Sequence, residues 1–179
     1  MSHLLTVRGH TPRLGPDCRV LPTAILTGDL VAGAGCTFWF HTVVRADVNA
    51  IRLGDAVNVQ DGACLHYTYE KHALRVGSRV SIGHRAIVHG CTIEDDVLVG
   101  MGAIVMDGAH VESGTLIAAG AVVTQGMRCE SGWIYAGVPA RPIKRLTPEA
   151  FAGEVQRIAA AYPMYAGWYQ TSEVEYVEQ

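Results

Sequence analysis

The sequence predicts an all-β fold, a parallel β-helix, with one C-terminal α-helix packed on its flank. The first observation is a repeat: from Val20 to Val123 an aliphatic or aromatic residue recurs at every sixth position, with few interruptions. The second is a change of period after Thr147, where apolar residues recur at helical spacing. A period of six fits neither a heptad nor an amphipathic helix, but it fits a short strand followed by a turn.

Three six-residue units make one triangular coil, and stacked coils pair their backbones about 4.8 Å apart. A β-sandwich with a chance period is the alternative, and the length of the repeat argues against it. Irregular steps occur at Asn49–Arg52 and at Tyr67–Arg75. The repeating positions are Val20, Leu26, Ala32, Phe38, Val44, Leu53, Val59, Leu65, Val76, Ile82, Val88, Ile93, Val99, Val105, Val111, Ile117 and Val123.

The repeat stops near Met127, and residues 133–142 are expected to form an extended strap. Thr147 as N-cap and Pro148 at the first helical position open the predicted helix. Pro163 is expected to end it, before a short second turn and a frayed tail from Ser172. The apolar stripe of this helix comprises Phe151, Val155, Ile158, Ala159 and Tyr162.

These features divide the chain into a β-helix domain, residues 1–145, and a C-terminal helix and tail, residues 146–179. Within the 179 residues the net charge is −3 and Lys and Arg form no cluster, so we expect no nucleic-acid or membrane partner. No run approaches the roughly 18 apolar residues of a membrane span.

The cysteine pattern and the N-terminal residues indicate the cellular compartment. The five cysteines are widely spaced and form no C-x-x-C pair, so we interpret them as small apolar fillers in a reducing cytosol rather than disulfides or a zinc knot. The first six residues lack the basic head and apolar run of a signal peptide. We therefore expect a cytoplasmic protein.

Two histidines are placed by the repeat on one face of successive coils. Leu65 and Val88 are three units apart once the break is discounted, and His66 and His89 each follow by one position. The two imidazoles should stack about one strand spacing apart, roughly 4.8 Å. One metal ion can bridge such a pair.

A third histidine, His84, falls around a corner of the triangle and should stack with Asp61. Arg45 falls in the two-histidine column, one coil lower. A cyclic homotrimer would present the Asp61/His84 edge of one subunit to the two-histidine column of the next, which would make three equivalent sites. Arg45 and Asp61 would then form a cross-subunit pair, although a surface ion pair of little energetic value is the alternative.

Three neutral imidazoles with an open fourth position describe a catalytic metal site rather than a structural one. Zn²⁺ suits them, as would Fe²⁺ or Co²⁺, and histidines alone do not choose among these ions. Such an ion lowers the pKa of a bound water to about 7. A histidine at a coil corner is otherwise usually a solvated turn residue, which is how we interpret the rest: His3, His10, His41, His72 and His110.

The motifs around these residues together resemble the γ-class carbonic anhydrase family. The resemblance covers about residues 10–145. The left-handed sense of the coils is implied by the resemblance alone, since parallel crossovers are otherwise almost always right-handed. The resemblance also implies that His66, His84 and His89 bind the metal, with the position of His84 supplied by the adjacent subunit. The motifs are Arg45–Asn49, Asn58–Gly62, Leu65–His66, Gly83–His84, Val88–Ile93 and Val99–Ala103.

The resemblance implies roles for other residues. Gln60 matches a residue that hydrogen-bonds the metal-bound water. Arg45, Asp47 and Asp61 match an interface network around the site. Tyr135, two residues before Gly137-Val138-Pro139, resembles a tyrosine that faces the metal, although its spacing fits a core residue equally well.

The chain departs from the family at the groups that activate water and carry protons. Active members have a glutamate after the residue matching Asp47, where this chain has Val48, and a second one in an acidic loop. Here the loop, residues 67–72, offers Glu70 or His72 as substitutes. Ala46 replaces a usual glycine, a mild change.

Three functions compete on this sequence. Reversible hydration of CO2 to bicarbonate uses all three histidines. A hexapeptide acyltransferase would need one histidine as general base and a groove for acyl-CoA or acyl-carrier protein, and would leave the His66/His89 pair unexplained. A relative that keeps the metal but hydrolyses thioesters, or that has no catalytic role, is the third. Metal content separates the second function from the others, and CO2 hydration separates the first from the third.

Overall fold

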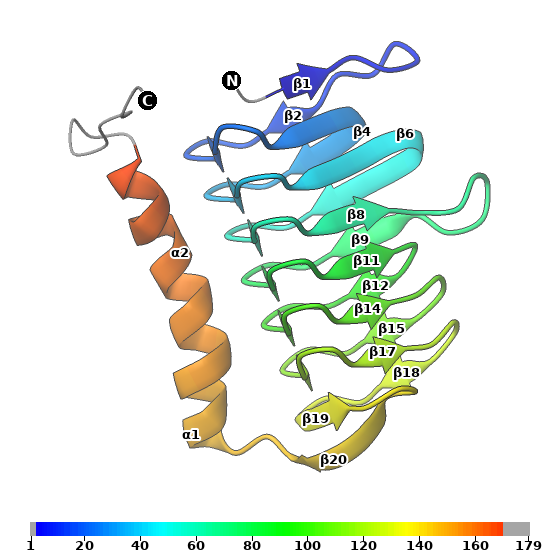
Figure 1. Ribbon diagram of the computed structural model, residues 1–179, viewed down its shortest axis with the longest axis vertical. Helices are drawn as coiled ribbons and strands as arrows, with labels where there is room; N and C mark the ends of the chain where they lie inside the picture. The colour runs from blue at the N-terminus through cyan, green and yellow to red at the C-terminus, as the bar shows by residue number, and fades with distance from the viewer. Residues whose placement is uncertain (1–2, 170–179) are drawn as a thin grey trace, which may run out of the picture.

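The computed structural model describes residues 3–169 and shows a stack of coils with a helical segment along its side (Figure 1). Nearly all strand pairs are parallel and join residues one coil apart, such as Leu65 with Val88 and Val59 with Ile82. These four side chains are fully buried. The predicted parallel β-helix is therefore confirmed, and the repeating residue points into the core.

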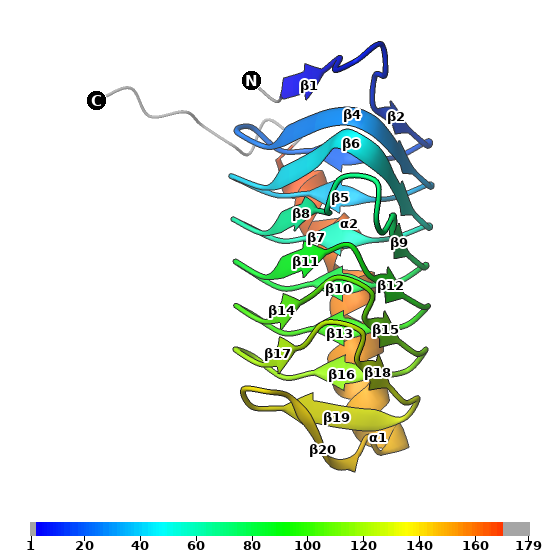
Figure 2. The ribbon, with the colours of Figure 1, turned by 90° about the vertical axis from the view of Figure 1, so that its right-hand side faces the viewer.

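The strands form three faces (Figure 2). The helix face carries β3 (Arg19–Val20), β5 (Thr37–Phe38), β7 (Asn58–Val59), β10 (Ser81–Ile82), β13 (Leu98–Val99), β16 (Leu116–Ile117) and β19 (Trp133–Ala136). The histidine face carries β1 (His3–Leu5), β8 (Cys64–His66), β11 (Ile87–His89), β14 (Ile104–Val105) and β17 (Val122–Val123). The third face carries β2 (Arg13–Leu14), β9 (Leu74–Val76), β12 (Thr92–Ile93), β15 (His110–Val111) and β18 (Arg128–Cys129).

Two long strands, β4 (Ile25–Ala32) and β6 (Val43–Leu53), bend around the corner between the histidine face and the third face. The irregular step expected at Asn49–Arg52 therefore lies within a continuous strand. The break expected at Tyr67–Arg75 is shorter than predicted, because β9 already begins at Leu74. The expected strap is an antiparallel pair, in which β20 (Arg141–Arg145) returns along β19 and covers the edge of the last coil.

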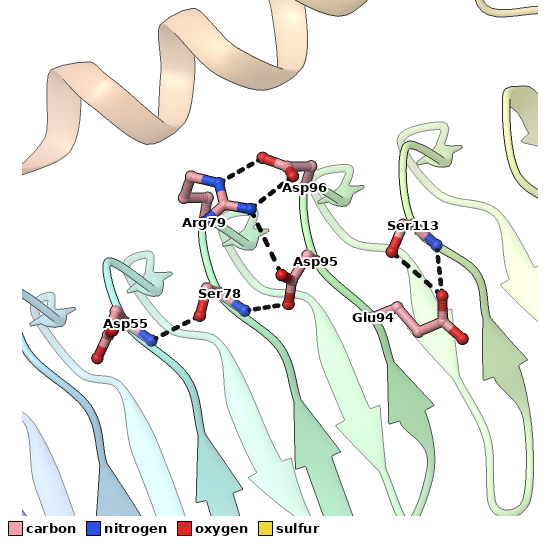
Figure 3. Close-up of polar contacts among 7 residues, drawn as sticks. All are labelled: Asp55, Ser78, Arg79, Glu94, Asp95, Asp96 and Ser113. Atoms are coloured by element: carbon pink, nitrogen blue, oxygen red, sulfur yellow. Dashed lines mark hydrogen bonds and ion pairs between the residues drawn. The ribbon is translucent and has the colours of Figure 1, made fainter.

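Side chains cap the backbone at one corner of the stack (Figure 3). There the N–H of Asp55 donates to Ser78 Oγ at 3.1 Å, and the N–H of Ser78 donates to Asp95 Oδ1 at 2.8 Å. Farther along, the N–H of Ser113 donates to Glu94 Oε2 at 3.0 Å. These bonds satisfy donors that a turn would otherwise leave unpaired.

The C-terminal segment begins as predicted and ends later than predicted. It comprises α1 (Pro148–Ala150), a π-helical stretch η1 (Phe151–Gln156) and α2 (Arg157–Trp168). Thr147 Oγ1 accepts from the N–H of Ala150 at 3.2 Å, which confirms the N-cap.

Pro163 lies inside α2, so the expectation that it ends the helix is wrong. Around it, Tyr162 and Ala166 pack against Trp39, whose ring centroid lies 5.2 Å from that of Tyr162. This tertiary packing overrides the local preference of proline. The tail from Ser172 lies outside the described residues. None of the helices within residues 3–169 has the length and apolar character needed to cross a membrane.

We predict that Trp39→Ala loosens the C-terminal helix while the coils stay intact. The indole is 6% exposed, and truncating a buried Trp typically costs about 3–5 kcal/mol. Limited proteolysis should then cut within α2, and the free energy of unfolding should fall by a similar amount. Met164→Ala, on the exposed side of the same helix, is the control. Equal resistance of both variants to protease would contradict this account.

Candidate metal centre

His66 and His89 form a column on the histidine face. They end β8 and β11 and are direct partners in the parallel register, as the repeat predicted. Their ring centroids are 5.3 Å apart, and His66 Nδ1 lies 3.3 Å from His89 Nε2. Two nitrogens bound to one tetrahedral Zn²⁺ at about 2.0–2.1 Å would stand roughly 3.3–3.4 Å apart, so the spacing fits a shared ion.

The outer nitrogen of each ring faces a carboxylate. His66 Nε2 lies 3.3 Å from Asp47 Oδ1, and His89 Nδ1 lies 2.8 Å from Asp107 Oδ1. When the outer nitrogens donate to these carboxylates, both inner nitrogens present bare lone pairs to each other. Facing lone pairs favour a cation between them, and carboxylate–histidine contacts of this kind are typical of metal ligands.

Arg45 supplies positive charge at this place in the single chain. Its guanidinium lies 2.6 Å from Asp47 Oδ2 and 3.2 Å from His66 Nδ1. Burial, together with the charge of Arg45, lowers the pKa of His66. Partial burial works against ionisation of Asp47, but the hydrogen bond and charge of Arg45 prevail and lower the pKa of that carboxyl. The cluster therefore favours a neutral His66 beside an ionised Asp47.

Asp107 was missed by sequence reasoning, although the repeat held the signal. It follows Val105 by two positions, just after β14, the strand that pairs with β11 in the next coil. Thr68 Oγ1 donates to Asp107 Oδ2 at 2.6 Å. Partial burial alone would raise the pKa of Asp107, but the hydrogen bonds from Thr68 and His89 outweigh it and lower that pKa. An ionised carboxylate is thus held against His89.

Tyr67 forms a wall of the same site. Its ring lies nearly parallel to that of His66, with centroids 5.4 Å apart, and the side chain is fully buried. Its hydroxyl accepts a hydrogen bond from the N–H of Asn49. Sequence reasoning did not separate Tyr67 from the loop that follows it, because the loop breaks the repeat.

His84 lies on a different corner, after β10 on the helix face. His84 Nδ1 is 2.9 Å from Asp61 Oδ2, which confirms their predicted stacking, and His84 Nε2 is 3.3 Å from the hydroxyl of Tyr162 on α2. Gln60 is 4% exposed and donates from Nε2 to Asn58 Oδ1 at 3.0 Å. Gln60, His84 and Tyr162 line a cavity of about 490 Å³ between α2 and the helix face.

One chain thus brings the predicted residues together in two separate groups. Arg45, Asp47, His66 and His89 form the first, and Gln60, Asp61 and His84 form the second. Within residues 3–169, no three His, Cys, Asp or Glu side chains are arranged to hold a metal ion. Arg45 and Asp61 each pair within the chain, with Asp47 and His84 respectively.

Tyr135 is not brought to either group. It pairs with Ile117 at an inward position of the last coil, is 3% exposed, and its hydroxyl accepts from the N–H of Glu130 at 2.8 Å. The tyrosines that contact site histidines are Tyr67, stacked on His66, and Tyr162, beside His84; the sequence analysis assigned Tyr162 to the packing stripe of the helix. How the helix docks on the coils is not encoded in the repeat, so its register could not be predicted.

Comparisons with known proteins agree with the fold and the motifs. Residues 90–125 match the family described as bacterial transferase hexapeptide (six repeats). The chain is 37% identical over 163 residues to a carbonic anhydrase of Geobacillus kaustophilus, covering 91% of this chain and 88% of that protein. It is 38% identical over 154 residues to mitochondrial gamma carbonic anhydrase 1 of Arabidopsis thaliana, covering 83% of this chain.

The chain spans 56% of the length of that plant relative. Among solved structures, a putative acetyltransferase of Bacillus cereus superposes with a TM-score of 0.90 at 33% identity, covering 94% of this chain and 97% of that one. The structural neighbour and the sequence relatives therefore carry different activity names on the same fold.

We predict that Asp107→Asn weakens zinc binding about 10–100-fold, because the amide is a poorer acceptor for the outer nitrogen of His89. Calorimetric titration of the metal-free protein with Zn²⁺ measures the effect. Asp17→Asn, at an exposed turn far from the histidines in the repeat, is the control. Unchanged affinity in Asp107→Asn would show that the carboxylate does not orient a ligand.

Proposed function

The chain belongs to the γ-class carbonic anhydrase family, and on that premise we propose that it hydrates CO2 reversibly to bicarbonate at metal sites between the subunits of a homotrimer. The observation that carries the proposal is the pair of inner nitrogens of His66 and His89, 3.3 Å apart, with both outer nitrogens held by carboxylates. This arrangement supports a shared cation whose remaining positions are open to a further ligand.

In the proposed site His66 and His89 of one subunit and His84 of the next hold Zn²⁺, or Fe²⁺ or Co²⁺ in its place. The ion, when bound, makes a water acidic enough to supply hydroxide at neutral pH. His84 is suited to reach outward, because its side chain is 42% exposed on its corner. Its contact with Asp61 would hold the ring in place as the carboxylates hold the other two.

The remaining residues would position groups and stabilise the interface. The Gln60 amide, held by Asn58, would orient the attacking oxygen. Tyr162 lies against His84 and would bound the site on the helix side. Arg45 would exchange its contact with His66 for a cross-subunit contact with Asp61, which frees the inner nitrogen of His66.

Proton release needs a group that replaces the missing glutamates. Val48 cannot serve, and Glu70 is exposed on the loop. The His72 ring lies over the backbone of Gly108, and its charge contributes to lowering the pKa of Asp107, the partner of His89. We therefore propose that His72 passes the proton to the buffer.

A hexapeptide acyltransferase is the second candidate. The similarity to the Bacillus cereus acetyltransferase structure and the match to the hexapeptide family support it. It would use one histidine as general base and would leave the two stacked imidazoles and their carboxylates without a role. A metal-binding thioesterase or a non-catalytic relative would keep the metal and lack CO2 hydration.

We predict that metal-loaded protein hydrates CO2, slowly in weak buffer and faster as an imidazole-type buffer is added. His89→Ala should lose both metal retention and hydration, and His72→Ala should lose activity only at low buffer concentration. Stopped-flow hydration with a pH indicator and metal analysis measure these effects. No hydration above background in concentrated buffer would overturn the proposal and favour thioester hydrolysis. Full activity of His89→Ala would favour acyl transfer.

We predict that Arg45→Ala weakens the trimer more than it disturbs the coil. Removing the guanidinium would leave Asp61 of the neighbouring subunit with its own His84 as sole partner at the interface, and losing one partner of a buried ion pair costs about 3–5 kcal/mol where burial is deep. Analytical ultracentrifugation should show dissociation at concentrations where the wild type stays trimeric. The far-UV circular dichroism spectrum of the coil should stay unchanged. Arg13→Ala, an exposed arginine of β2 on the third face, is the control. An unaltered association constant would reduce Arg45 to a surface residue.

A further inference from the structure

Two of the five cysteines are neighbours on adjacent coils. Cys18 directly precedes β3 and Cys36 directly precedes β5, and these strands pair in register, Arg19 with Thr37. In-register residues of neighbouring parallel strands have Cα atoms about 4.8 Å apart and point to the same side. Disulfides form at Cα separations of about 4.4–6.8 Å, so the backbone already meets this requirement.

The two sulfur atoms occupy equivalent positions. Cys18 Sγ lies 3.1 Å from the carbonyl oxygen of Gly33, and Cys36 Sγ lies 3.2 Å from that of Gly54. Gly33 and Gly54 are themselves stacked, since a Cβ on Gly33 would meet Gly54 O at 2.8 Å. Both thiols are free, and each faces a backbone carbonyl of the adjoining coil.

Reactivity is divided unequally between these thiols. Cys18 is half-buried and Cys36 is fully buried, so a solvent-borne reagent reaches Cys18 first. The neighbouring Cys36 thiol lowers the pKa of Cys18 to about 7, whereas the neighbouring Cys18 thiol and burial raise the pKa of Cys36. Burial raises the pKa of the other three thiols, Cys64, Cys91 and Cys129.

We propose that Cys18 and Cys36 are a peroxide-sensitive dithiol that oxidises to a disulfide joining two adjacent coils. The Cys18 thiolate attacks one oxygen of hydrogen peroxide, the O–O bond breaks, and hydroxide leaves and is protonated to water. The resulting sulfenic acid is attacked by the Cys36 sulfur, which forms the S–S bond as the S–O bond breaks and a second water leaves. Two thiols together lose two electrons and two protons, and one peroxide becomes two waters.

The test uses the full chain, reduced and then treated with hydrogen peroxide. Non-reducing peptide mapping by mass spectrometry should find a Cys18–Cys36 disulfide with the other three thiols unmodified, and dithiothreitol should reverse it. The oxidised protein should melt at a higher temperature than the reduced one, because the bond constrains the unfolded chain. A disulfide that involves another cysteine, or first oxidation at Cys64, would overturn the proposal.

Variants separate the role of Cys18, which attacks peroxide, from that of Cys36, which closes the disulfide. Cys18→Ser should abolish the disulfide, and Cys36→Ser should leave a Cys18 sulfenic acid that dimedone traps. The alkylation rate of Cys18 by iodoacetamide should have its pH midpoint near 7 in wild type and higher in Cys36→Ser; Cys36→Ala repeats the measurement if the serine variant fails to fold. Cys64→Ser, at the other half-buried thiol, is the matched control and should behave as wild type. An unshifted midpoint without Cys36 would show that the two thiols do not act together.

Discussion

Backbone hydrogen bonds between coils hold every other feature in place, because they fix which residues become neighbours. The N–H of Gly90 donates to the carbonyl of His66 at 3.0 Å, next to the paired strands β8 and β11. A shift by one residue would turn His66 and His89 toward the core and bring their buried neighbours outward. Close approach of the coils enforces this register: a Cβ on Gly83 would lie 2.7 Å from the N atom of Met101.

The register explains which parts could be predicted from the sequence. A period of six gives the face and the coil of each residue, so the stacking of His66 on His89 and of His84 on Asp61 followed by counting. Counting along the six-residue repeat says nothing about contacts between the coils and the C-terminal helix, which has a different period. Tyr162 belongs to the helix, and its place beside His84 depends on packing around Trp39 that no local pattern states. The continuation of the helix past Pro163 has the same origin.

Tyr135 shows the limit of the family resemblance, and Asp107 shows the limit of our reading of the repeat. The resemblance implies that Tyr135 faces the metal, and within one chain its side chain occupies an inward position of the last coil, apart from both groups of site residues. Asp107 carries no family motif, yet its distance from Val105 places it one coil from Gly90, the residue that follows His89.

Stacking also brings like side chains of successive coils within one strand spacing of each other, so their repulsion must be relieved by a neighbouring group. Arg52 and Arg75 are direct partners in the register, and Arg52 is neutralised sideways by Asp29 at 2.9 Å. The histidine column cannot be relieved in that way, because Asp47 and Asp107 already occupy the outer nitrogens and leave the inner lone pairs facing each other. A cation at the inner nitrogens removes that repulsion while both outer nitrogens keep their carboxylate partners. Within one chain Arg45 supplies positive charge at Nδ1 of His66, and a divalent ion would serve both inner nitrogens while leaving Arg45 available to a neighbouring subunit.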